Sequence, residues 1–552
     1  MVGQGHTDAE LVDASDERVE SLTLERPAIM IATGAVLIGG ILLVATYQSL
    51  VAFGSDSLGE EGGKGQGVSI EWGESLYMPR HEECVDEDNG QVMPEYGIGY
   101  EPSISITSNG NMFITAHKDL RWGGEDAPIP IILDPDDPGL WWACTDGQET
   151  SWDYWASWFW ASHDNGTTWG HGDNFGPTPG NMLFANYLAG GSECLGDEGD
   201  ISVDSFDVVY YLDTTLEDNW WHRLSDNGVN YEEGPCQRMN TMAADDRPWV
   251  AAQGDGIIHY LGNSGASPPE CSGDSGRYWY YHSEDGGASF SQCYSMPGGW
   301  STISAQRSGP YVFVAQEDAD SSTGTVHVRI SDDYGRGTGP GPSEGTWQEP
   351  VVVGNRTGNC PEGYPVVNNN EGGTVAVVWA DCPEGGTGRW LVNFAISYNN
   401  GTNWSEPWTI CCSDEYPNSP FNGIGMYPFI SISEDDIVSI SFYGLDFDPL
   451  QEGGGGYKEG GKWFLYAGAV LSPEWGDSWP FSIADPDPLH VVTAYEEGSS
   501  DVHALHDFFE TVISPDGSWI GIAYQQNVGQ HPFEENEEQR YIKFVRGNIS
   551  SS

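Results

Sequence analysis

Hydrophobic and polar residues alternate along most of the chain, in pairs of short segments joined by turns rich in Gly, Asp and Asn. The clearest pair is EPSISITSNGNMFITAH at 101–117, which turns at Asn109 and Gly110. Alternation with a period of two predicts β-strands, and a tight turn between two such runs predicts a hairpin. Similar pairs lie at 199–214, 246–262, 299–316, 364–381, 427–444 and 506–524. The pattern therefore predicts seven hairpins and an all-β fold.

A second motif follows most of these hairpins. The segment SHDNGTTW at 162–169 has the spacing S-x-D-x-G-x-x-W, and SEDGGASF at 283–290 repeats it with Phe in the last place. Degenerate copies follow at steps of 48 to 75 residues, the size of a four-stranded unit with its loops. The motif positions are Asp164, Gly166, Trp169, Asp226, Asp285, Gly287, Asp333, Asn399, Trp404 and Glu474.

The two repeats together predict a β-propeller with seven blades between residues 68 and 548. Six blades remain an alternative, because the last hairpin has no motif after it and relies on YIKFVRG at 541–547 as its third strand. The strand QGVSIEW at 66–72 is expected to complete the last blade and to close the ring.

The recurring S-x-D-x-G-x-x-W motif is the Asp box, and through it the chain resembles the sialidase-superfamily propellers, also called BNR-repeat proteins. The resemblance covers nearly all of 68–548. It implies a ligand site on the top face, where the inner strands begin, and Asp boxes on the opposite face. We therefore expect Asp164 to bond to backbone N–H groups of its own turn, with Trp169 packed between strands or blades.

Residues at the starts of the inner strands are then candidates for the rim of the central channel. They are Glu101, Asp246, Arg247, Tyr364, Tyr427 and Asp507, with Asp200 and His506 beside them. Enzymes of the family clamp a substrate carboxylate with three arginines and use a tyrosine nucleophile, a glutamate and an aspartate. Here the arginine motif at the start of blade 1 reads YEPS, with Glu101 in the arginine's place, which counts against sialidase chemistry. Arg247 could equally form an ion pair with Asp246.

The N-terminal region suggests a membrane anchor. An acidic tail at 1–26 precedes a predicted transmembrane segment at 27–53, in which residues 28–47 carry no charge, the length of a bilayer core. A cleaved signal peptide or a buried helix are the alternatives. Arg18 and Arg26 before the segment favour an internal N-terminus. We expect a single-pass protein of the cell membrane, with a flexible stalk at 54–67 and an extracytoplasmic propeller.

The composition of the chain limits the kinds of partner that the protein can bind. The 84 acidic residues against 20 Lys and Arg give a formal net charge of −64, which excludes the basic face that nucleic acid requires. Such acidity suits a marine or halophilic microbe. Ten cysteines favour disulfides. Cys271/Cys293 and Cys360/Cys382 share a spacing of 22, and Cys411 and Cys412 form either a vicinal disulfide or two separate bridges.

Long acidic and aromatic insertions on the predicted top face favour recognition of a glycan or a surface protein there. The alternatives are a glycoside hydrolase related to sialidases and a structural or assembly platform. A cluster of carboxylates at Asp134, Asp136 and Asp137 could bind calcium, although a solvated acidic surface is the simpler interpretation.

Overall fold

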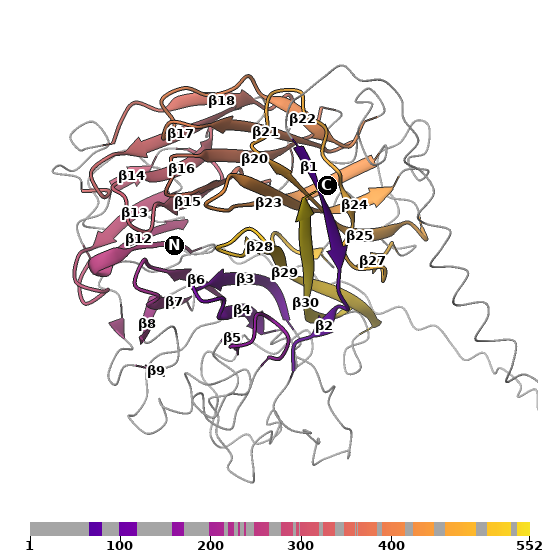
Figure 1. Ribbon diagram of the computed structural model, residues 1–552, viewed down its shortest axis with the longest axis horizontal. Coiled ribbons are helices and arrows are strands. Elements are labelled where there is room, and N and C mark those ends of the chain that lie inside the picture. The colour runs from indigo at the N-terminus through magenta and orange to yellow at the C-terminus, as the bar shows by residue number, and fades with distance from the viewer. Residues whose placement is uncertain are drawn as a thin grey trace, which may run out of the picture. The chain divides into compact units, whose positions relative to one another are not determined.

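The computed structural model describes residues 66–79, 99–118, 157–169, 198–214, 219–225, 230–231, 237–238, 248–263, 278–290, 294–296, 298–318, 324–336, 347–358, 360, 363–383, 389–413, 423–446, 459–492, 505–530 and 538–551. All of them belong to the second of two compact units, Gly62–Ser552. In this unit the strands form a seven-bladed β-propeller whose blades follow one another in chain order (Figure 1).

The first four blades are antiparallel sheets built from consecutive strands. Blade 1 holds β3 (Gly99–Ile106), β4 (Met112–Lys118) and β5 (Trp158–Ser162). Blade 2 holds β6 (Glu198–Val203), β7 (Val209–Thr214), β8 (Asn219–Ser225), β9 (Asn230–Tyr231) and β10 (Gln237–Arg238). Blade 3 holds β11 (Trp249–Gln253), β12 (Ile257–Asn263), β13 (Tyr278–Ser283) and β14 (Tyr294–Met296). Blade 4 holds β15 (Ser301–Ala305), β16 (Val312–Glu317), β17 (Thr325–Ser331) and β18 (Val351–Asn355).

The last three blades repeat the plan and include the two ends of the described chain. Blade 5 holds β19 (Val366–Asn369), β20 (Val375–Asp381), β21 (Leu391–Ser397) and β22 (Trp408–Cys411). Blade 6 holds β23 (Gly423–Ile432), β24 (Ile437–Asp446) and β25 (Lys462–Leu471), with β26 (Ser482–Ile483) and β27 (His490–Val491). Blade 7 holds β28 (Glu510–Ile513), β29 (Trp519–Gln530), β30 (Glu538–Ser551) and β1 (Gln66–Trp72), and β2 (Leu76–Tyr77) pairs with β30.

The N-terminal strand β1 closes the ring, as predicted. Its residues from Val68 to Trp72 pair with β30 of blade 7, and Gln66 and Gly67 pair with β25 of blade 6. In Figure 1 the indigo β1 lies beside the yellow β30. Residues 66 and 67, the last two of the predicted stalk at 54–67, belong to this strand.

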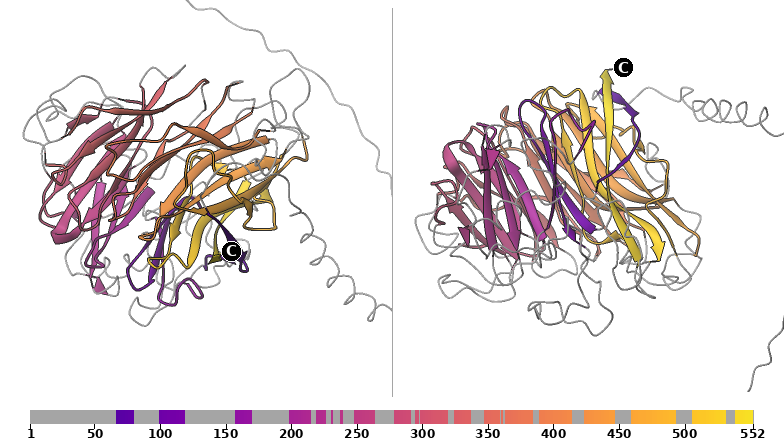
Figure 2. Two further views of the ribbon diagram at one scale, coloured as in Figure 1. Left: turned by 45° about the horizontal axis from the view of Figure 1, so that its top comes forward. Right: turned by 90° about the horizontal axis from the view of Figure 1, so that it is seen from below.

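Large aromatic side chains fill the spaces between the blades. The largest side chains that are almost fully buried are six tryptophans and six tyrosines, among them Trp160, Trp221, Trp279 and Trp379. Figure 2 shows the neighbouring sheets standing side by side. Burying an aromatic side chain contributes about 1.5–3 kcal/mol, so the high aromatic content of the chain serves the packing of blade against blade.

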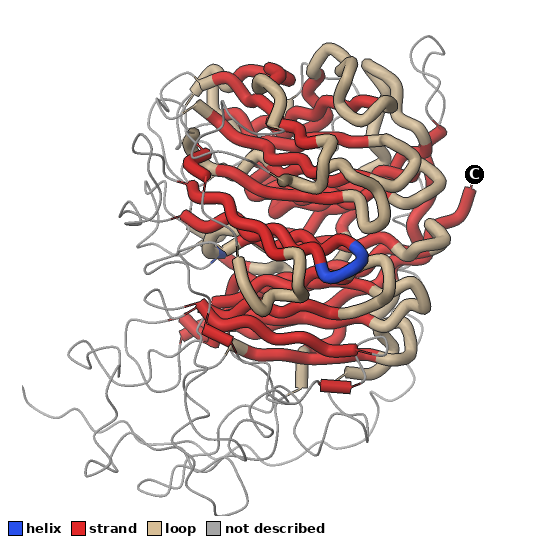
Figure 3. Tube along the Cα trace, turned by 90° about the vertical axis from the view of Figure 1, so that its left-hand side faces the viewer, coloured by secondary structure: helices blue, strands red, loops and turns tan. Residues whose placement is uncertain are grey.

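The S-x-D-x-G turns follow the third strands of their blades. After β5, the Asp164 carboxylate accepts bonds from the Thr168 N–H (2.8 Å), the Thr168 hydroxyl (2.6 Å) and the Ser162 hydroxyl (2.8 Å). Asp285 after β13 makes the same set of contacts, and Asn399 after β21 accepts from Ser397 and from the Asn403 N–H. Figure 3 shows that most of the described loops, drawn in tan, lie at one end of the strands. In these three copies the acidic or amide side chain bonds to its own turn, which is a structural role.

The remaining copies differ in detail. Ser331 Oγ accepts from the N–H groups of Asp333 and Gly335. After β25 the acceptor is Asp477, which binds the Glu474 N–H at 2.6 Å, so Glu474 does not take the predicted place of the aspartate. Gly166 and Gly287 have φ of 79° and 87°, a left-handed conformation that favours glycine. Asp226 lies outside the described residues.

Where one of these turns ends in an aromatic residue, that residue packs on the preceding blade. The Trp169 ring lies 4.9 Å from Phe544 of blade 7, and Phe290 lies 5.8 Å from Trp221 of blade 2. Trp404 packs against the cluster between blades 4 and 5. The turns therefore join neighbouring blades at the bottom of the propeller.

Two disulfides lie in the described part of the chain. Cys360 bonds Cys382, one of the two pairs with a spacing of 22, and Cys411 bonds Cys412 as a vicinal disulfide, one of the two alternatives for these residues. Cys271 and Cys293, the other pair with this spacing, lie outside the described residues. So do the predicted tail, anchor and most of the stalk, and the part of the chain that the structure does describe holds no helix able to cross a membrane.

Candidate functional site in the central channel

The seven inner strands β3, β6, β11, β15, β19, β23 and β28 surround a channel and are joined by hydrogen bonds from blade to blade. The bonds run Ile104 N–H to Glu510, Ser103 to Asp200, Val250 N–H to Asp200, Gly254 N–H to Arg307 O, Val367 N–H to Thr302, Ile432 N–H to Asn368, and Ile513 N–H to Ser431. Polar side chains thus satisfy backbone groups that the hairpins leave unpaired, and the ring fixes the channel wall.

Two buried carboxyl groups meet on this wall. Ser103 Oγ lies 2.7 Å from both Asp200 Oδ1 and Glu510 Oε2. A hydroxyl has one proton to donate, so it binds one carboxylate and accepts from the other group. Burial, and then the charge of Asp200, raise the pKa of Glu510 well above its ordinary value. Ser103 therefore bridges the two carboxyl groups, and Glu510 holds its proton more tightly than an ordinary glutamate.

Five aromatic side chains close the upper part of the channel, and we call them the aromatic group. They come from the inner-strand starts of blades 3 to 7 and are Trp249, Trp300, Tyr364, Phe429 and Phe508. The Trp249 ring lies 5.1 Å from Phe508, 5.6 Å from Tyr364 and 6.5 Å from Phe429. Because these partners belong to blades 5 to 7, Trp249 reaches across the channel from blade 3.

Below the aromatic group the channel encloses a cavity of about 220 Å³. Asp200, Glu510 and Trp249 line its upper end, and Arg307, Glu371 and Glu434 line its lower end. Arg307 Nη2 donates to Ile106 O at 3.0 Å, from blade 4 to blade 1. Burial lowers the pKa of Arg307, and the charges of Asp207, Glu434 and Glu371 oppose that change. Arg307 therefore holds a charge at the bottom of the channel, among acids.

Glu101, the first predicted rim residue, lies in a buried cluster between blades 1 and 7. Its carboxylate is 3.3 Å from His117 Nε2 and 3.6 Å from His506 Nδ1. The Tyr100 ring stacks between those two imidazoles, with centroids 4.4 Å and 3.9 Å away. Arg540 Nη1 contacts His506 Nε2, and since arginine only donates, Nε2 accepts and Nδ1 carries the proton toward Glu101. The side chain of Glu101 is 2 % exposed. The cluster therefore holds blade 7 against blade 1, where the ring closes.

Three more of the predicted rim residues, Tyr364, Tyr427 and Asp507, are also buried. Tyr364 belongs to the aromatic group, and Tyr427 packs on Trp390 and Tyr443. The Asp507 N–H donates to Glu101 Oε1 at 3.4 Å. Asp246 and Arg247 lie outside the described residues, as do the calcium candidates Asp134, Asp136 and Asp137. Contact of any of these residues with a ligand stays a prediction.

Three non-glycine residues near the inner-strand starts have positive φ. Glu101, Tyr427 and His506 have φ of 52°, 51° and 49°. Such strained backbone persists only where the surroundings enforce it, and it concentrates at functional sites. The strain occurs at matching places in blades 1, 6 and 7, and the strand register of blades 1 and 6 shifts there.

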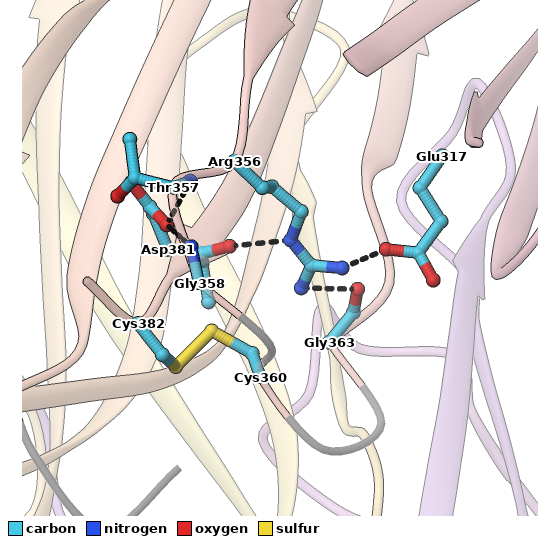
Figure 4. Close-up of a disulfide and its surroundings, with 9 residues drawn as sticks. Glu317, Arg356, Thr357, Gly358, Cys360, Gly363, Asp381 and Cys382 are labelled. Carbon is cyan, nitrogen blue, oxygen red and sulfur yellow. Dashed lines mark hydrogen bonds and ion pairs between the residues drawn. A yellow bond between two sulfur atoms is a disulfide. The ribbon is translucent and has the colours of Figure 1, made fainter. Parts of the chain in front are cut away.

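Arg356 has a structural role, because its guanidinium is buried and fully bonded within the propeller. Its guanidinium pairs with Glu317 and donates to Ala380 O at 3.0 Å and Gly363 O at 2.9 Å (Figure 4). Burial lowers its pKa to about 10. Arg389 donates to Ser413, and Arg121 lies outside the described residues. Among the described residues, the one arginine that lines the cavity is therefore Arg307, at the lower end.

Sequence reasoning missed Glu510, Trp249 and Arg307. Each sits in a hairpin that was predicted, and Arg307 forms part of a tight turn. A carboxylate inside an apolar strand, as in FFETVIS, was the available signal for Glu510. In the described part of the chain, no group of three or more His, Cys, Asp and Glu residues is arranged to hold a metal ion.

No protein-family model and no curated protein matches the chain. Solved structures similar to it include a protein of unknown function from Dyadobacter fermentans, at 14% identity and a TM-score of 0.37, covering 87% of this chain and 99% of the other. The NanB sialidase of Streptococcus pneumoniae has 13% identity and a TM-score of 0.32, covering 82% and 68%. The α-L-arabinanase of Penicillium chrysogenum has 12% identity and a TM-score of 0.31, covering 55% and 92%. Likeness at this level carries no argument about activity.

Proposed function

We propose that this propeller recognises a glycan through its top face, on the aromatic group at the upper end of the channel. The observation that carries the proposal is the meeting of five aromatic rings from five consecutive blades. Aromatic faces are the surfaces on which the apolar faces of sugar rings stack. Trp300 and Phe429 are only partly buried, which leaves part of their surface for a ligand.

The proposal includes two further assignments. The S-x-D-x-G turns are Asp boxes of a sialidase-superfamily propeller, which fits their place after the third strands and their bonds to their own backbone. Residues 28–47 form a membrane anchor that holds the propeller at the outer surface of the cell, as their uncharged length suggests. Recovery of the full-length chain in an alkaline-washed membrane fraction tests the anchor, and release into the soluble fraction would contradict it.

A glycan array probed with the full-length chain tests the recognition proposal. We expect binding to a restricted set of glycans and its loss in Trp300→Ala. The matched control is Trp475→Ala, since Trp475 is 63% exposed and lies in the turn after β25, at the opposite face. Binding that disappears equally in both variants, or an array without signal, would contradict a top-face site.

A glycoside hydrolase is the second candidate, and one observation favours it. Glu510 and Asp200 form a carboxyl pair bridged by Ser103, and glycosidases use a protonated and an ionised carboxyl together. Their remaining bonds to backbone N–H groups fit a structural role better. Turnover of an oligosaccharide panel that stops in Glu510→Gln supports the enzyme, and binding without turnover supports recognition.

A further inference from the structure

In the part of the chain that the structure describes, the exposed Phe, Tyr and Trp side chains all lie in turns at the bottom of the propeller. They are Phe206, Tyr398 and Trp475, which are 65%, 45% and 63% exposed. Phe206 lies in the hairpin turn between β6 and β7, and the other two lie in the turns after β21 and β25. Apolar rings that stay in water on one face of a protein mark a surface that contacts a partner.

The three rings are spread over this face. Tyr398 donates its hydroxyl to Pro473 O at 2.6 Å, so the turns that hold Tyr398 and Trp475 touch each other between blades 5 and 6. Phe206 belongs to blade 2, which in a ring of seven is three blades from blade 5 and three from blade 6. A small ligand cannot contact both places, whereas an extended surface that lies across the face contacts them together.

The chain also enters the propeller at this face. Strand β1 begins at Gln66, which pairs with Leu471 at the end of β25, and the turn that holds Trp475 follows directly after Leu471. Strand β30 ends at the same face (Figure 3). Residues 28–47, which carry the proposed anchor, therefore precede a strand that starts beside the turn of Trp475.

The chemistry of the rings points to a membrane as the extended surface. Trp and Tyr are enriched at the level of lipid headgroups, and Phe and Trp are the apolar side chains that proteins lying on a membrane bury there. Turns at the bottom face also carry the carboxylates of Asp207, Glu434, Asp435 and Glu474. Anionic headgroups repel these carboxylates, so zwitterionic headgroups suit the face better.

We infer that the bottom face rests on the headgroup region of a zwitterionic bilayer, with the rings of Phe206, Tyr398 and Trp475 inserted there. The inference rests on the proposed membrane anchor, which brings this face to the bilayer. It has a consequence for recognition, because the top face then points away from the membrane and toward ligands outside the cell.

Hydroxyl-radical footprinting of the full-length chain in phosphatidylcholine vesicles tests the contact, with the same chain in a non-ionic detergent as the reference. Mass spectrometry measures the oxidation of each side chain. We expect the three rings to lose their oxidation in vesicles. Val491 is 43% exposed and pairs with Lys462, at the opposite end of β25 from the turn of Trp475, so its oxidation should stay unchanged.

Retention on the vesicles separates this inference from the anchor. A chain that stays with the vesicles while all three rings remain oxidised overturns the contact and leaves the anchor standing. A chain that leaves the vesicles contradicts the anchor, and the inference fails with it. Stronger protection of the rings in phosphatidylglycerol vesicles at low salt than in phosphatidylcholine vesicles would also overturn the proposed contact.

A double variant shows whether the rings make the contact. Phe206→Ser combined with Trp475→Ser changes two exposed side chains, and it should restore the oxidation of Tyr398 in vesicles, because one ring alone does not hold the face on the bilayer. The matched control is Val491→Ser, which should keep Tyr398 protected. Protection of Tyr398 that persists in the double variant would overturn the assignment of the contact to these rings.

Discussion

Buried charges in this acidic chain are paired, as Arg356 and Glu317 illustrate. Their side chains are 5% and 4% exposed, and Arg356 also binds two backbone carbonyls (Figure 4). Arg336 and Glu284 form a comparable pair at the surface, where their side chains are 43% and 50% exposed. The two pairs share a chemistry and differ in environment, which makes them a matched comparison.

Arg356→Met should lower the free energy of unfolding by about 3–5 kcal/mol, because it leaves the Glu317 carboxylate buried without its partner. Arg336→Met should cost no more than about 1 kcal/mol, since water solvates Glu284. Denaturant unfolding of both variants measures the difference. Equal losses would show that Arg356 does not act through burial of its ion pair.

The buried His259 should make stability depend on pH. Burial lowers its pKa to about 3, whereas an unfolded histidine titrates near about 6.5. The unfolded chain therefore takes up a proton below pH ~6.5 that the folded chain refuses, and stability falls as the pH falls from there toward ~3. His259→Gln should reduce the slope of unfolding free energy against pH by about 1.4 kcal/mol per pH unit in this window. An unchanged slope would contradict burial of a neutral His259.

At the scale of elements, the hairpins and their turns were predictable because they depend on neighbours in sequence. Alternation located the inner two strands of each blade, and the S-x-D-x-G spacing located the turns after β5, β13, β17 and β21. For the turn after β25 the predicted acceptor was wrong, because Asp477 accepts the hydrogen bond and Glu474 does not. Gly476 still has the positive φ of the motif glycine, at 86°, whereas the residue that supplies the acceptor differs from the motif.

Asp164→Ala should lower the unfolding free energy by about 1–2 kcal/mol, because it removes the acceptor of three bonds in the turn after β5. Burial is the largest single influence on the Asp164 pKa and raises it, but the bonds from Thr168 and Ser162 together outweigh burial and lower the pKa. Asp164→Asn should cost less, since Asn399 fills the same place in blade 5. Denaturation curves give both values. Loss of glycan binding in a folded Asp164→Ala chain would contradict the assignment of this turn to the bottom face.

The role of β1 in closing the ring can be tested by removing the whole strand. A chain that begins at Gly73 lacks the strand that joins β25 to β30, whereas one that begins at Gly62 retains it. We expect the shorter chain to lose cooperative unfolding, because it exposes the edges of blades 6 and 7. Calorimetry of the two chains compares them directly. The same transition in both would show that β1 is dispensable.

At the scale of the whole molecule, the candidate sites depend on contacts that sequence patterns do not encode. Ser103 meets Asp200 and Glu510 only because blade 7 returns to blade 1, and Arg307 reaches Ile106 across 201 residues. The sequence indicated that inner-strand starts carry acids and aromatics. It did not indicate which of them line the channel, because Glu101 and Asp507 are instead bound into the closure between blades 7 and 1.

The central claim is that the top end of the channel recognises a glycan while the bottom turns are structural. The most direct measurement is the dissociation constant of the strongest array glycan for the full-length chain, for Trp300→Ala and for Trp475→Ala. We predict that Trp300→Ala weakens binding about tenfold or more and that Trp475→Ala leaves it unchanged. The reverse order, with binding lost at Trp475 and kept at Trp300, would contradict the account.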